Sequence, residues 1–79
     1  MAVLKIRLRE LVEEKALREG RDLEAHPITQ EEIASATGLS RPTVSAWMRN
    51  IVDRLERESL IKFCRYLECQ VGDLLVIEE

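Results

Sequence analysis

The sequence predicts a small all-α domain of five helices, with the two ends of the chain paired as a short β-sheet. Three observations support this fold class. Thr29 and Ser40 are helix-start residues placed before two short apolar-periodic segments, and Gly38 between those segments suits a sharp turn. Apolar residues recur at helical spacing in the flanking segments, and β-branched residues gather at both chain ends. The 79 residues allow one domain with a modest core.

The N-terminal part begins with a strand predicted at residues 3–6 and continues with a first helix over residues 8–18. Gly20 is expected to end that helix. The inner face of the helix carries Leu8, Leu11, Val12 and Ala16.

A second helix is predicted over residues 30–37. Thr29 is its N-cap, and Glu32, three residues later, completes a capping box that satisfies the first amide donors. Ala34 faces the next helix, where a small side chain lets two backbones approach closely. Gly38 then stands where the turn commonly requires a positive φ.

A third helix follows over residues 41–49. Ser40 caps it by accepting from the amide of Thr43, because Pro42 in the first turn has no amide to donate. Val44 and Trp47, three residues apart, form its buried stripe, and Met48 beside Trp47 is expected to be half-buried. The residues expected to point outward are Arg41, Thr43, Ser45, Ala46 and Arg49.

The C-terminal part predicts a fourth helix over about residues 56–68 and a last turn over residues 71–75. Val76 and Ile77 then form a strand that pairs with residues 3–6, within one chain or across a dimer. The fourth helix has an apolar stripe of Leu60, Phe63, Cys64 and Leu67. On this stripe Cys64 is interpreted as buried and reduced, in preference to a redox switch with Cys69.

Composition excludes several classes of function. One histidine and two cysteines without a CxxC pair disfavour a zinc site, and no other metal or cofactor is indicated. No nucleophile with a recognisable base partner and no glycine-rich phosphate loop occurs, so we expect a protein that is not an enzyme. No apolar run approaches the roughly 20 residues that span a bilayer, and the N-terminus becomes charged too early for a secretory signal. A cytoplasmic protein without a membrane partner is therefore expected.

The formal net charge of −3 conceals an uneven distribution. Residues 58–79 carry two basic and five acidic side chains, whereas basic and acidic side chains balance in the rest of the chain. Between residues 40 and 57 the balance is positive, with four arginines against Asp53 and Glu56. A locally basic face can therefore exist on an acidic protein, although so few cations imply weak non-specific binding to nucleic acid.

The segment ITQEEIASATGLSRPTVSAWMRN (residues 28–50) closely resembles the helix-turn-helix of the λ-repressor and Cro-like (XRE) family. IRLRELVEEK before it resembles the first helix of that family, and LIKFCRYLECQVGDLL after it resembles the fourth and fifth helices. The chain departs from the family pattern at an insertion, residues 19–28, interpreted as a solvated loop rather than a second DNA or protein contact. A second departure is Ile51 and Val52, interpreted as core rather than as part of a subunit interface.

The resemblance implies one domain over residues 1–79 that binds double-stranded DNA in a sequence-specific manner, with the helix at 41–49 in the major groove. It implies base contacts by Arg41, Thr43, Ser45, Ala46 and Arg49 and phosphate contacts by Gln30, Ser40 and Arg54. The resemblance therefore implies a transcriptional regulator, which we expect to be a homodimeric repressor. The alternative is a protein-interaction module, such as an antitoxin-like protein that binds a protein partner.

Overall fold

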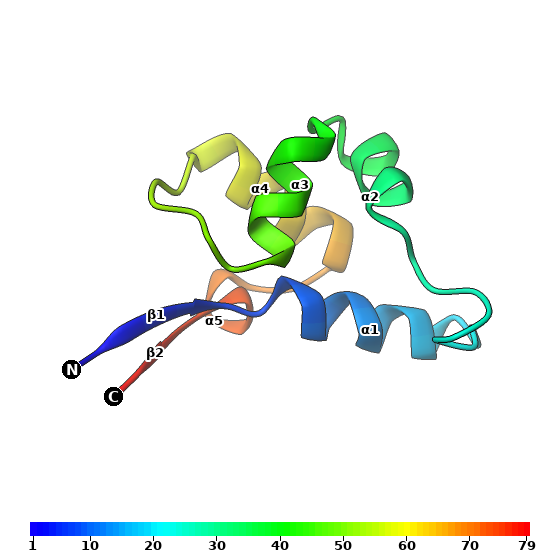
Figure 1. The fold of residues 1–79 in the computed structure, drawn as a ribbon, viewed down its shortest axis with the longest axis horizontal. Helices are drawn as coiled ribbons and strands as arrows, with labels where there is room; N and C mark the ends of the chain where they lie inside the picture. Colours follow the sequence, from blue (N-terminus) through cyan, green and yellow to red (C-terminus); the bar gives the residue numbers. More distant parts are fainter.

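The computed structural model describes residues 1–79 and confirms the predicted class, five helices with a two-stranded sheet (Figure 1). The elements are, in order, β1 (Val3–Ile6), α1 (Leu8–Arg18), α2 (Gln30–Thr37), α3 (Arg41–Met48), α4 (Arg57–Leu67), α5 (Val71–Leu74) and β2 (Leu75–Glu78). The helix expected to end at Arg49 ends at Met48, and the fourth helix is one residue shorter at each end. None of the five helices has the length and the apolar composition of a membrane span.

The sheet joins the two ends of one chain. β1 and β2 are antiparallel, with Val3 opposite Glu78 and Ile6 opposite Leu75. Figure 1 shows both strands projecting from the helical body, with the N- and C-termini side by side at the outer end of the strand pair. An isolated pair of strands is marginally stable in water. Here the base of the pair is anchored in the protein, because Ile6 and Leu74 are buried.

The core lies where the helices meet and is centred on two aromatic side chains. Trp47 of α3 and Phe63 of α4 pack with ring centroids 4.9 Å apart at an interplanar angle of 43°. Both are almost fully buried, as is Val44. The other buried apolar residues are Ile6, Leu8, Val12, Ala16, Ile28, Ile33, Leu67 and Leu74. Trp47 is therefore a core residue, and it holds the inner face of α3 against α4.

Four helices are followed by a left-handed residue: Gly38 follows α2, and the other three share one hydrogen-bond pattern. Gly20 follows α1 with φ 76°, Asn50 follows α3 with φ 57°, and Glu68 caps α4 with φ 54°. Each end has the paired amide-to-carbonyl bonds of a Schellman motif. Asn50 has a further role, because its Oδ1 accepts a hydrogen bond of 2.9 Å from the amide of Ile6. The end of α3 is thereby tied to β1.

The segment 19–28 is held more firmly than the predicted solvated loop. Its exposed residues are as expected, but Ile28 is buried in the core. Arg21 also donates two hydrogen bonds to the Glu32 carboxylate, at 3.0 and 2.6 Å. The amide of Glu32 bonds the Thr29 hydroxyl as predicted (3.1 Å), but its carboxylate turns to Arg21, so the expected capping box is only half formed.

Two packing predictions are wrong in part. Ile51 was expected in the core, yet 56% of its surface is exposed, whereas Val52 is half-buried against the core. The reason is the left-handed turn at Asn50, which redirects the chain while the amide of Ile51 bonds the Ala46 carbonyl (3.1 Å). Cys64 is a free thiol but only half-buried, because it lies at the edge of the core rather than in its centre.

Candidate nucleic-acid interface

The caps and the turn between α2 and α3 form as the sequence predicts. Gly38 adopts φ 78° and donates its amide hydrogen to the Ala34 carbonyl at 2.8 Å. The Ser40 hydroxyl accepts from the amide of Thr43 at 3.2 Å, and Pro42 occupies the first turn of α3. Two helices of eight residues each are thus joined by a three-residue turn. The capped start and the glycine turn fix the angle at which α3 leaves α2.

The outer face of α3 is defined by the two side chains that it buries. Because successive residues turn by about 100° around a helix, Ser45, Ala46 and Arg49 lie roughly opposite Val44 and Trp47. Arg49 is exposed, while Ser45 and Ala46 are half-buried. These three predicted base-contacting residues therefore share one outward face.

The other two predicted base-contacting residues lie at the edges of that face. Arg41 is exposed at the first turn of α3. Thr43 is half-buried, and its hydroxyl lies 2.8 Å from the Ser40 hydroxyl, so its polar atom already takes part in the cap. Pro42, which was not among the predicted site residues, is exposed between them. The same helical spacing puts the apolar ring of Pro42 on this face, so the sequence could have identified it.

The charges on this surface are available for a ligand. Arg41, Arg49 and Arg54 form no ion pair, whereas Arg7, Lys15 and Arg21 are all paired with carboxylates. The predicted phosphate-contacting residues lie at the margins of the motif: half-buried Gln30 in the first turn of α2, exposed Ser40 before α3, and exposed Arg54 in the turn before α4.

Arg21 also belongs to this region, although the sequence did not predict it. Its two hydrogen bonds hold the pKa of the Glu32 carboxyl below the ordinary value, although partial burial opposes that shift. The same contact raises the pKa of Arg21, so both groups stay charged. Arg21 therefore neutralises a carboxylate in the first turn of α2, beside Gln30. The many charged residues of the insertion were the only sign in the sequence that Arg21 is paired. Its partner, Glu32, lies eleven residues further along the chain, so local spacing could not identify it.

The arrangement of α2, the glycine turn and the capped α3 defines a helix-turn-helix domain. The family model described as Cro/C1-type HTH DNA-binding domain matches residues 22–79, and the chain belongs to this family. The protein is accordingly a DNA-binding regulator. The match begins after α1, so the likeness of α1 to the first helix of the family stays a prediction. No curated protein and no solved structure matches the chain significantly.

No group of three or more histidine, cysteine, aspartate or glutamate side chains is placed to hold a metal ion. The groups exposed at this surface are hydrogen-bond donors and unpaired guanidinium groups on and beside α3. Such groups suit the base edges and phosphates of a duplex.

Proposed function

We propose that the protein is a repressor that binds operator DNA as a homodimer, with α3 of each copy in the major groove. The observation that carries the proposal is the pair of exposed, unpaired arginines, Arg41 and Arg49, at the two ends of an outward face on a firmly packed helix. Two such helices about 34 Å apart would enter successive major grooves on one side of a duplex. Occupation of a promoter by this dimer would exclude polymerase.

Arg41 is the principal base-reading residue in this proposal. Its guanidinium group can donate two hydrogen bonds to O6 and N7 of a guanine, which is worth roughly 1–3 kcal/mol of discrimination. Arg49 would reach a base or a phosphate at the far end of the same helix. Ser45 can bond a base edge, and Ala46 offers only a methyl contact, for instance to thymine. Thr43 would contribute mainly through its methyl group, because its hydroxyl is engaged with Ser40.

Phosphate contacts would position α3 in the groove. Gln30 lies where the partial positive charge of the α2 N-terminus faces outward, which favours an anion. The ion pair between Arg21 and Glu32 supports this role in part, because it neutralises one of the two carboxylates in the first turn of α2. The other, Glu31, is exposed and forms no ion pair. Arg54 would bind a neighbouring phosphate. Ser40 would bind another, because its O–H stays free to donate when the Thr43 hydroxyl donates to the Ser40 oxygen. Since few cations contribute, a monomer would bind weakly and the dimer supplies the affinity.

The test begins with selection of binding sites from a random duplex pool. Fluorescence anisotropy then compares the selected duplex with a scrambled control at about 50 and 200 mM salt. We expect a palindromic consensus bound at least about a thousandfold more tightly than the scramble. Equal, weak binding to both duplexes that disappears at the higher salt concentration would contradict the proposal and favour a protein partner instead.

Substitution of the reading residue sharpens this test. Arg41→Ala should lower the affinity for the selected duplex by about tenfold or more and relax the preference at one position of the consensus. Arg9→Ala is the matched control, because Arg9 is an exposed, unpaired arginine on α1. If specific binding survives Arg41→Ala unchanged, Arg41 is not the reading residue.

A further inference from the structure

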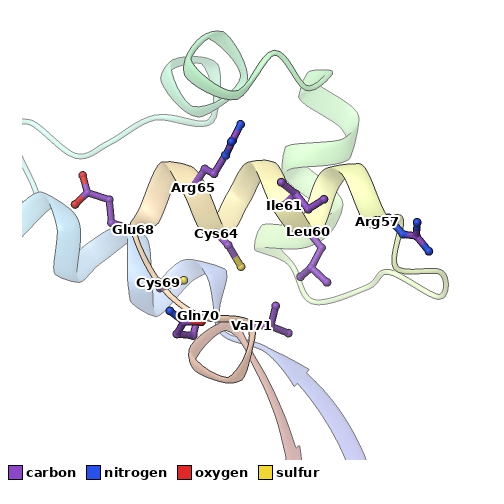
Figure 2. Close-up of a pocket in the computed structure, with 9 residues that line it drawn as sticks. All are labelled: Arg57, Leu60, Ile61, Cys64, Arg65, Glu68, Cys69, Gln70 and Val71. Atoms are coloured by element: carbon purple, nitrogen blue, oxygen red, sulfur yellow. The ribbon is translucent and has the colours of Figure 1, made fainter.

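A groove lies between α4 and the turn that leads into α5, outside the surface assigned to DNA. It has a volume of about 340 Å³. Figure 2 shows it lined along α4 by Leu60, Ile61 and Cys64 and closed from the α5 side by Val71. Arg57 lies at one end of α4 and Glu68 at the other. Arg65 also lines the groove, three residues before Glu68. The groove is therefore apolar in its middle, with Arg57 at one end and both Arg65 and Glu68 at the other.

Much of the apolar lining is uncovered in the single chain. Ile61 and Val71 each expose 49% of their surface, and Leu60 and Cys64 are half-buried. Covering these side chains with a partner would remove apolar surface from water, which favours association. The charges at its ends are also free, because neither Arg57 nor Glu68 forms an ion pair within the chain.

The order of residues along α4 identifies the partner. Arg57, Ile61 and Cys64 are spaced by four and three residues, which places them in one stripe along α4. Glu68, the left-handed C-cap, follows four residues later at the end of that stripe. When this stripe is laid against a reversed copy of itself, Arg57 meets Glu68 and Ile61 meets Cys64. A C2 dimer requires such a self-complementary surface, in which each contact occurs twice.

We propose that a second copy of this chain docks in the groove, with the two α4 helices antiparallel and Arg57 of each copy paired with the partner's Glu68. A second copy places a group of opposite charge against both Arg57 and Glu68 at once, which is the observation that favours it. The inference supplies an interface for the dimer in the proposed function, but it does not depend on DNA binding. Because α4 has eleven residues and is about 16 Å long, the interface is small and the dimer is expected to be weak, with a Kd in the micromolar range.

The test is a charge exchange followed by sedimentation without DNA, at protein concentrations from about 10 μM to 1 mM. Arg57→Glu would bring two acidic groups together at each end of the interface, and Glu68→Arg would bring two basic groups together. Each variant alone should weaken the dimer by about tenfold or more, because like charges face one another twice. An equimolar mixture of the two variants should recover a heterodimer, and the double variant should recover a homodimer.

Controls separate this interface from general effects of charge and folding. Arg9→Glu makes the same change of charge on exposed α1 and should leave the dimer unchanged. Circular dichroism should show the same helix content in every variant. A wild-type protein that stays monomeric at about 1 mM overturns the proposal, as do single variants that dimerise like the wild type. Failure of the mixture or of the double variant to recover a dimer overturns the antiparallel pairing. None of these results depends on whether the chain binds an operator.

Discussion

Asn50 should contribute to stability in two ways that substitution can separate. Its side-chain oxygen accepts the amide hydrogen of Ile6 at 2.9 Å, and its backbone has φ 57°. Asn50→Gly keeps the left-handed conformation but leaves the Ile6 amide without its partner, which costs about 1–2 kcal/mol. Asn50→Ala loses the same bond and adds left-handed strain of roughly 1 kcal/mol. Asn50→Asp keeps both an acceptor oxygen and tolerance of this conformation.

These costs are large for a domain of this size. At 0.05–0.15 kcal/mol per residue, 79 residues give a total free energy of unfolding of roughly 4–12 kcal/mol. Urea unfolding should therefore rank the stabilities as wild type and Asn50→Asp together, then Asn50→Gly, then Asn50→Ala. The melting temperature should fall by about 4–8 °C for each kcal/mol lost. If Asn50→Gly is as stable as the wild type, the bond to Ile6 contributes nothing and the reasoning is refuted.

Four other substitutions or reactions test further contacts. Arg21→Ala should lower the melting temperature at neutral pH, because it removes the hydrogen bonds that lower the pKa of Glu32 in the folded state. The difference in melting temperature between variant and wild type should persist above the ordinary carboxyl pKa. It should vanish at lower pH, where Glu32 is protonated. Ser40→Ala should cost about 0.5–2 kcal/mol in urea unfolding by removing the cap of α3, and an unchanged midpoint would contradict the cap. Burial and the nearby Cys64 thiol raise the pKa of Cys69 to about 11. Near pH 8, Cys69 should therefore be alkylated about a hundredfold more slowly in the folded protein than in the urea-unfolded protein, which peptide mapping can measure. Glu68→Arg should weaken operator binding although it adds a positive charge, because the monomer lacks the second recognition helix; tighter binding in fluorescence anisotropy would contradict that linkage.

The helix boundaries followed from the sequence wherever a local chemical signal set them. Thr29 and Ser40 cap the helices predicted from them, and Gly38 has the positive φ that the turn requires. The apolar spacing of Val44 and Trp47 likewise gave the buried face of α3. Each of these features depends on residues within a few positions of one another. Local sequence is therefore enough to predict them.

The features that the sequence did not predict depend on the path of the chain. The pairing of Arg21 with Glu32 requires the intervening loop to return to the start of α2. The bond between Asn50 and Ile6 joins residues 44 positions apart. Glu68 in a left-handed conformation had no local signal, because glycine and asparagine are the usual residues there. The roles of the arginines toward DNA stay predictions, since a surface position alone does not identify a contact.

The short recognition helix explains why these distant contacts matter to function. Eight residues are too few to form a stable helix in water by themselves, so the orientation of α3 depends on what holds it. Ser40 caps one end, Asn50 ties the other end to the sheet, and Trp47 packs on Phe63 between them. Phe63 belongs to α4, whose other face forms the proposed dimer groove. A dimer made through α4 would therefore fix each α3 through rigid aromatic packing, so the spacing of the two recognition helices would be set by the interface rather than by a flexible connection.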